Sequence, residues 1–160
     1  MSRAKTPPGW TIEKMAALGT LHAELEAKGD LEPLLATLAP DPVYEFHPLR
    51  RCMRGDERVR RFYEQFCTRF LSLRHDFALI AEWVSIDSVA QEYEISLRVD
   101  GAIEHFRVLG ILYARGDSKS RAASGTRVEA IKLGGERVYA SERFIRLLTG
   151  PLFDELEPLE

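Results

Sequence analysis

Apolar residues recur every three or four positions along the first part of the chain, which is the spacing of one buried stripe on a helix. One such stripe spans residues 11–29, and the glycine at its end is typical of a helix C-terminus. A second helix is predicted over residues 31–38, because Pro40 disfavours helical geometry in the residue before it. A third is predicted to begin after Gly55, where the apolar spacing resumes. The first part of the chain is therefore expected to be mostly helical.

After Leu73 the pattern changes to the alternation and the β-branched and aromatic composition of strands. Strands are predicted over residues 75–86, 88–99 and 102–113 and within 126–140, in addition to a short early strand over 43–47. Asp100-Gly101 predicts a two-residue hairpin, since both central residues of that turn need positive φ. The polar stretch 116–125 is expected to be a surface loop, and Ser141 is expected to cap a short terminal helix.

Helices followed by a curled antiparallel sheet indicate an α+β domain with the helices on one face of the sheet. A sheet bent over helices leaves a cavity at its open end, and cavities of this kind hold small molecules between mostly apolar walls. We expect this domain to cover residues 10–150. Residues 1–9 are predicted to be a flexible lead with two prolines, and residues 151–160 an acidic tail.

Composition and charge narrow the classes of partner. A chain of 160 residues, 45% apolar and 29% charged, can bury a core without disulfides or structural metal. The net charge of −3 does not favour a nucleic-acid partner, and no apolar run reaches the ~18 residues of a membrane span. Cys52 and Cys67 lack the spacing of a zinc site, as do the four histidines. We expect a soluble cytoplasmic protein that uses no metal or cofactor and binds neither nucleic acid nor membrane.

Two segments carry a family resemblance. Residues 27–63 read AKGDLEPLLATLAPDPVYEFHPLRRCMRGDERVRRFY and residues 134–150 read GGERVYASERFIRLLTG. They resemble the nuclear transport factor 2-like superfamily, especially its SnoaL-like and ketosteroid isomerase-like members. The resemblance implies a cone-shaped, cystatin-like α+β barrel, commonly a homodimer, with a pocket between sheet and helices. Members include isomerases, cyclases and epoxide hydrolases as well as proteins without known activity, so the resemblance does not assign the chemistry.

The catalytic sets of those members are not matched residue by residue. Where ketosteroid isomerase-like members carry a general-base aspartate followed by proline, the nearest match is His47-Pro48. Their helical tyrosine corresponds to His22, and their strand aspartic acid falls near Gly110. The closing Trp-Arg-Asp-Tyr of limonene epoxide hydrolase-like members corresponds to Glu-Arg-Val-Tyr at residues 136–139. The scaffold is therefore expected without the known acid–base groups.

His47 is the leading acid–base candidate, because an imidazole can take and give a proton at neutral pH. Tyr139 or Tyr44 would then donate a hydrogen bond to a developing oxyanion. Alternation along the strand places Tyr44 and Phe46 on one face and His47 on the other, and only one face can line the cavity. Burial of large side chains favours Tyr44 and Phe46, whereas the resemblance favours His47. The choice of face stays open, as does a structural role for His47 at the strand end.

Aromatic residues and one histidine are expected to contact a ligand. They are Tyr44, Phe46, Phe62, Phe66, Trp83, Tyr93 and His105. The hairpin register places Glu94 diagonally beside His105, where a carboxylate could orient the imidazole. The competing interpretation, which we favour, is a cross-strand ion pair between Glu94 and Arg107 on a solvated face. His22 is interpreted as a hydrogen-bonded structural histidine of the first helix.

Two functions follow from this sequence. The first is a SnoaL-like protein of unassigned chemistry that binds a small hydrophobic molecule in the pocket; if it is an enzyme, we expect a cofactor-independent isomerase, cyclase or dehydratase with His47 as the acid–base group. The second is a non-catalytic ligand-binding or protein-interaction scaffold, which the loss of the known catalytic sets favours. A homodimer is expected in either case.

Overall fold

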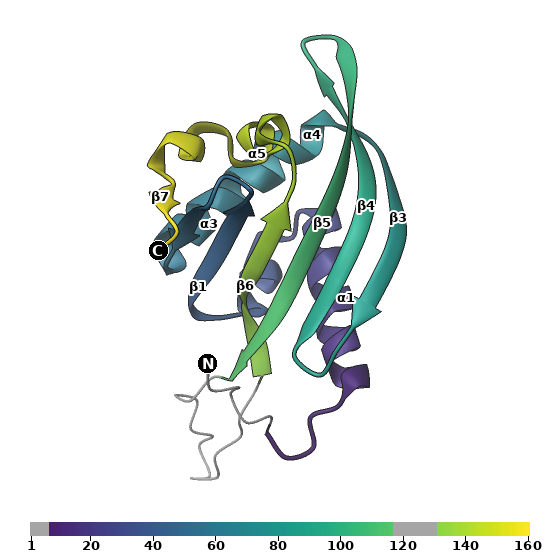
Figure 1. Cartoon of the computed structure of the whole chain (residues 1–160), viewed down its shortest axis with the longest axis vertical. Helices are drawn as coiled ribbons and strands as arrows, with labels where there is room; N and C mark the ends of the chain where they lie inside the picture. Colours follow the sequence, from purple (N-terminus) through teal and green to yellow (C-terminus); the bar gives the residue numbers. More distant parts are fainter. Residues whose placement is uncertain (1–6, 117–130) are drawn as a thin grey trace.

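Two helices begin the part of the chain that the computed structural model describes, which is residues 7–116 and 131–160 (Figure 1). Helix α1 (Ile12–Lys28) begins at Thr11, whose hydroxyl accepts a hydrogen bond from the backbone N–H of Lys14. It ends at Gly29, whose φ of 68° is the left-handed conformation expected of glycine there. Helix α2 (Leu31–Ala36) follows directly. Both predicted helices are confirmed to within two residues at each end.

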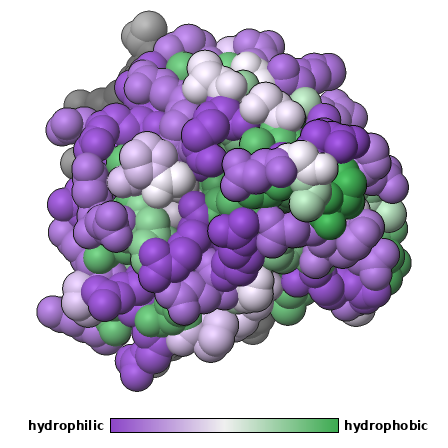
Figure 2. All heavy atoms as spheres, turned by 90° about the horizontal axis from the view of Figure 1, so that it is seen from above, coloured by the Kyte–Doolittle hydropathy of each residue, from purple (hydrophilic) through white to green (hydrophobic). Residues whose placement is uncertain are grey.

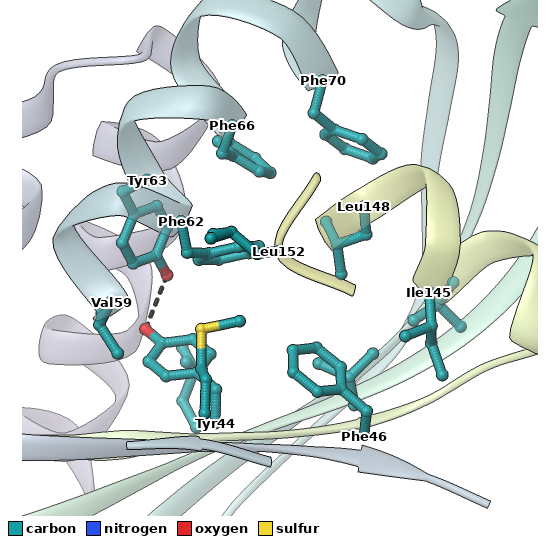
Figure 3. Packing of buried hydrophobic residues seen from close by; sticks show 14 of the residues in the cluster. Tyr44, Phe46, Val59, Phe62, Tyr63, Phe66, Phe70, Ile145, Leu148 and Leu152 are labelled. Atoms are coloured by element: carbon teal, nitrogen blue, oxygen red, sulfur yellow. Dashed lines mark hydrogen bonds between the residues drawn. The ribbon is translucent and has the colours of Figure 1, made fainter. Parts of the chain in front are cut away.

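The third predicted helix is confirmed, and it contains a π-helical segment between two α-helical ones. It consists of α3 (Asp56–Gln65), a π-helical segment η1 (Phe66–Phe70) and a final turn α4 (Leu71–Leu73). A π-helical turn changes the angular spacing of side chains, and such turns are frequent at functional sites. Here Phe66 and Phe70 stack with their ring centroids 5.1 Å apart and point toward the sheet (Figure 3).

A single curved sheet faces these helices (Figure 1). Its described strands, in spatial order, are β3 (Arg74–Val84), β4 (Ser88–Val99), β5 (Ala102–Gly116), β6 (Ile131–Tyr139), β1 (Leu38–His47), β2 (Arg51–Arg54) and β7 (Glu157–Pro158). The hairpin at Asp100-Gly101 has the predicted register, with Ser96 opposite His105. The sheet does not close into a full barrel, because β3 and β7 lie at its two edges.

The sheet is mixed, which corrects the expectation of purely antiparallel pairing. β1 and β6 pair in parallel, with Tyr44 opposite Glu136 and Phe46 opposite Val138. Antiparallel neighbours can be joined by hairpins whose turn residues are recognisable in the sequence, whereas parallel neighbours are joined by long crossovers. The pairing of β1 with β6 therefore has no local signal in the sequence.

The C-terminal segment packs onto the domain, although the sequence indicated only an acidic tail. Helix α5 (Glu142–Thr149) begins at Ser141, whose hydroxyl accepts from the backbone N–H of Phe144 as predicted. The 3₁₀ helix η2 (Gly150–Glu155) and strand β7 follow, and β7 pairs with β2. Leu152 and Leu156 are buried in the core, which fastens this segment. The predicted surface loop 116–125 lies outside the described residues, apart from Gly116 at the end of β5.

The core lies between the concave face of the sheet and the helices. Figure 3 shows Phe62, Tyr63 and Phe66 pointing from the α3–η1 helix toward Tyr44 and Phe46 on β1. Tyr44 and Phe46 are almost completely buried. Burying large side chains is the main favourable term in folding, and it decides the orientation of β1 that the sequence left open.

Candidate functional site

A cavity of about 260 Å³ lies between the concave face of the sheet and the helices α1 and α3–η1. This volume is slightly below the roughly 300 Å³ at which pockets for drug-sized ligands begin, so the cavity suits a small molecule. Its wall is mostly apolar, and the phenylalanines that line it are Phe46, Phe62, Phe66, Phe70, Phe77 and Phe144.

The cavity opens on the side of β3. Phe77 and Leu79 border the cavity and are 48% and 49% exposed, and the exposed side chain of Arg74 lies beside them. In the view from above, apolar surface extends in a band to the right edge, the side on which β3 lies in Figure 1 (Figure 2). A hydrophobic molecule would therefore meet an apolar rim before it enters.

Polar side chains border the cavity from both the sheet and the helices. Apart from Arg74 at the opening, they are His22, Glu26, Tyr44, Tyr63, Gln91, Tyr93 and Glu136. A few converging polar groups in an apolar wall are what fixes the orientation of a bound ligand.

Glu136 is the group in this set with the most unusual environment. It projects from β6 opposite Tyr44 on β1 and Leu112 on β5, and its Oε1 atom lies over Gly110. A Cβ atom at Gly110 would stand 2.5 Å from Oε1, so the glycine provides the space that the carboxyl group occupies. Among the described residues, none forms a hydrogen bond or ion pair with this carboxyl group. Burial and, secondarily, the negative charge of Glu26 raise the pKa of Glu136 well above its usual range.

Gly110 is the residue near which the sequence resemblance placed a strand aspartic acid of ketosteroid isomerase-like proteins. In the structure, the carboxyl group of Glu136 lies over Gly110 from the neighbouring strand. Glu136 was not among the residues predicted from the sequence. The available signal was its alternation with Val138, which is buried on the same face of β6.

The ring of His22 has a defined tautomer. Its Nδ1 atom lies 2.7 Å from the Thr37 hydroxyl, and that hydroxyl lies 2.6 Å from the carbonyl oxygen of Leu34. The carbonyl can only accept, so the single hydroxyl proton of Thr37 is donated to it. Nδ1 of His22 must therefore carry a proton and donate it to Thr37. His22 is hydrogen-bonded as expected for a structural histidine, and it also borders the cavity.

The other ring nitrogen of His22 joins a network of hydroxyl and carboxylate groups. Nε2 lies 3.2 Å from the Tyr63 hydroxyl and 3.2 Å from Oε2 of Glu26. Tyr63 donates to the same Glu26 oxygen at 3.2 Å, and its hydroxyl lies 2.7 Å from that of Tyr44 (Figure 3). Burial raises the pKa of both tyrosines well above the usual range, and the charge of Glu136 adds to this for Tyr44. Both therefore remain protonated phenols at neutral pH.

The structure brings five of the predicted ligand-contacting residues to the cavity and leaves two outside it. Those that line the cavity are Tyr44, Phe46, Phe62, Phe66 and Tyr93. Trp83 is 56% exposed near the end of β3. His105 is exposed on the outer face of the β4–β5 hairpin, where its Nδ1 lies 2.8 Å from the Ser96 hydroxyl. On the same face Arg107 forms the predicted ion pair with Glu94, so the solvated interpretation is confirmed.

His47 and Tyr139, the predicted acid–base group and hydrogen-bond donor, lie on the face of the sheet opposite the cavity. Their rings stack at 4.8 Å between centroids, and Nε2 of His47 lies 3.0 Å from Oε2 of Glu45. Tyr139 is 40% exposed. The physical reason is the alternation along β1, because burying Tyr44 and Phe46 turns His47 outward.

Within residues 7–116 and 131–160, no three His, Cys, Asp or Glu side chains are grouped so that they could hold a metal ion. No helix in those ranges is long and apolar enough to cross a membrane.

Comparison with known proteins identifies relatives by sequence and by fold. Residues 20–130 match a family described as the SnoaL-like domain, and no curated protein matches the chain. A similar solved structure is an NTF2-like protein from Anabaena variabilis, with TM-score 0.60, 19% identity and coverage of 88% of this chain and 96% of that one. Another is SalBIII, an epoxide hydrolase/cyclase-like enzyme in pyran ring formation, with TM-score 0.59, 11% identity and coverage of 82% and 93%. PrhC from Penicillium brasilianum has TM-score 0.56, 15% identity and coverage of 89% and 90%. At these identities the likeness concerns the fold.

Proposed function

The chain belongs to the SnoaL-like domain family, and from that premise we propose that it binds a small, mostly apolar molecule in the cavity and transfers a proton to or from it without a cofactor. Glu136 is the acid–base group of this proposal. The observation that supports it is a carboxyl group that faces an apolar cavity and has no hydrogen-bond partner among the described residues. The Glu136 side chain is half-buried and its carboxyl group borders the cavity, so a ligand there is within reach of it and can supply the partner that the protein does not.

The raised pKa of Glu136 gives the chemistry its direction. The shift favours the protonated carboxyl group, which is an acid and a hydrogen-bond donor. It can protonate a carbonyl, hydroxyl or epoxide oxygen, and the resulting carboxylate can take a proton back. SalBIII, whose fold is similar, is described as an epoxide hydrolase/cyclase-like enzyme. Activation of an oxygen atom by a protonated carboxyl group is compatible with reactions of that class.

The role that the sequence indicated for His47 passes to Glu136 in this proposal. His47 is held by Glu45 and Tyr139 on the outer face of the sheet, and a ligand in the cavity would not reach it. The apolar cavity with its polar wall supports both the catalytic function and simple ligand binding, and the two differ only in whether Glu136 transfers its proton.

The test is turnover of a panel of small epoxides, ketones and alcohols, followed by mass spectrometry in ordinary and deuterated water. We expect one or more members to be converted by the wild type and by His47→Gln, and not by Glu136→Gln. The last substitution keeps the shape of the side chain and removes the transferable proton of the carboxyl group. Turnover that survives in Glu136→Gln, or that is lost in His47→Gln, would contradict the assignment.

A second proposal concerns self-association, because apolar side chains are exposed along the edge strand β3. Ile80 and Trp83, which do not border the cavity, are 46% and 56% exposed. Exposed large apolar side chains commonly mark an interface, and the commonest assembly of identical chains is a two-fold dimer. We propose that a second copy of the chain covers this surface.

A further inference from the structure

The two polar groups that face each other on the cavity floor have complementary hydrogen-bonding roles. Tyr44 on β1 and Glu136 on β6 are register partners, and both side chains line the cavity. Because both residues line one cavity, a ligand there can interact with each of them. Which ligand group suits both depends on where the protons of Tyr44 and Glu136 lie.

The direction of the hydrogen bonds around Tyr44 is set from outside the cavity. The Tyr63 hydroxyl has one proton, and it is donated to Oε2 of Glu26 at 3.2 Å. Tyr63 then has only lone pairs for Tyr44, whose hydroxyl lies 2.7 Å away. Tyr44 must therefore be the donor in that bond. The remaining lone pair of the Tyr44 oxygen is left for the cavity, so Tyr44 can accept a hydrogen bond there and cannot donate one.

His22 belongs to the same network. Thr37 fixes one ring proton on Nδ1, and Nε2 lies 3.2 Å from both the Tyr63 hydroxyl and Oε2 of Glu26. The direction of the bond between Tyr63 and Tyr44 therefore follows from the donation of the Tyr63 proton to Glu26. Tyr63 acts through Tyr44 and is a positioning residue.

We propose that the ligand of this cavity carries a hydroxyl group, which accepts a hydrogen bond from Glu136 and donates one to Tyr44. This inference rests on the proposed function and adds the chemical class of the ligand, a small apolar alcohol. A ketone or ether can accept from Glu136 but has no proton for Tyr44. A hydrocarbon satisfies neither group. Buried polar groups that lose a partner on binding disfavour the wrong ligand strongly, which is how such sites discriminate.

Three probes with one carbon skeleton test this preference: menthol, menthone and p-menthane. Their binding to the wild-type protein is measured by isothermal titration calorimetry near pH 7. We expect menthol to bind about tenfold more tightly than menthone, which corresponds to one lost hydrogen bond, and p-menthane to bind more weakly than either. Equal affinities for menthol and menthone would overturn the inference.

Two substitutions test whether the preference for menthol comes from the direction of the Tyr44 hydrogen bond or from the shape of the cavity. In Tyr44→Phe the acceptor is lost, so menthol should lose about tenfold in affinity while menthone changes little. In Tyr63→Phe the Tyr44 proton has no acceptor outside the cavity and can turn inward, so menthone should gain and the preference for menthol should disappear. Tyr139→Phe removes a hydroxyl on the opposite face of the sheet and is the matched control, which should keep the wild-type preference.

The outcomes distinguish this inference from the function on which it rests. If menthol and menthone bind equally and Glu136→Leu, which removes the hydrogen-bond donor, weakens both, the alcohol preference is wrong and the proposed role of the cavity stands. If none of the three probes binds, the proposed ligand role is contradicted together with the inference. A preference for menthol that persists in Tyr63→Phe would overturn the proposed proton direction.

Discussion

Tyr44 and Glu136 lie directly opposite each other in the parallel pair β1–β6, and both enter the same cavity. The two groups come from strands almost a hundred residues apart in the sequence, and only the pairing of these strands brings them together. The order of the strands also positions the carboxyl group. β5 is the other neighbour of β6, and Gly110 on β5 leaves the space in which the Glu136 side chain lies.

The pH dependence of stability is the first consequence of the buried carboxyl group. The folded-state pKa of Glu136 is raised above its unfolded value, so the folded protein holds a proton that the unfolded chain releases. Stability is therefore fully present below the unfolded pKa and falls as pH rises toward the folded pKa. The loss is about 1.4 kcal/mol for each pH unit between the two values.

Glu136→Gln removes this loss, because the amide does not ionise. The free energy of unfolding, measured in urea between about pH 5 and about pH 8, should fall more steeply in the wild type than in the variant. His47→Gln is the control. It keeps Glu136, so the decrease of its unfolding free energy with pH that is due to Glu136 should equal that of the wild type. Parallel curves for the wild type and Glu136→Gln would show that Glu136 ionises normally in the folded protein.

The close approach of Gly110 to Glu136 predicts a specific pairwise interaction. Gly110→Ala would place a methyl group 2.5 Å from Oε1, so the carboxyl group at the end of the flexible Glu136 side chain must move away, at a cost of at most about 1 kcal/mol. In a Glu136→Ala background the clash is absent, so the same substitution should cost much less. A double-mutant cycle of unfolding free energies measures the difference. An equal cost in both backgrounds would mean that the carboxyl group does not occupy this space.

Local features of the fold could be predicted from the sequence, because their causes are local. The end of α1 at Gly29 and the cap at Ser141 depend on residues within one turn of the helix. The register of the β4–β5 hairpin follows from Asp100-Gly101, because a two-residue turn allows one pairing.

The candidate site could be predicted only in part, because it depends on contacts between distant segments. The aromatic residues of β1 and α3–η1 were expected in the cavity on the basis of apolar spacing. A glutamate in a strand is usually solvated. The sequence around Glu136 does not indicate that its side chain lies over Gly110, because Gly110 belongs to another strand. His47 was expected in the cavity because of a family match, and the alternation of β1 overrode that match.

The tautomer of His22 gives a prediction that needs no ligand. Nitrogen-15 NMR of the wild type should show the proton on Nδ1, because the Thr37 hydroxyl accepts it. Thr37→Val keeps the side-chain shape and removes that acceptor, so it should lose the tautomer preference and about 1–3 kcal/mol of stability. Thr149→Val is the matched control, since Thr149 is also buried but its hydroxyl bonds only within α5. A wild-type spectrum with the proton on Nε2 alone would contradict the tautomer derived from the bond between Thr37 and Leu34.

The exposed side chains of β3 give the prediction for assembly. Multi-angle light scattering of the wild type should give twice the chain mass of 18.2 kDa. Trp83→Glu and Ile80→Glu place charges in the proposed interface and should shift the mass toward the monomer, because an unpaired charge is costly in an apolar contact. The control is Tyr139→Glu, which lies on the strand β6 away from this edge and should leave the mass unchanged. A wild-type mass of one chain at micromolar concentration would reject the dimer and leave β3 as the open rim of the cavity.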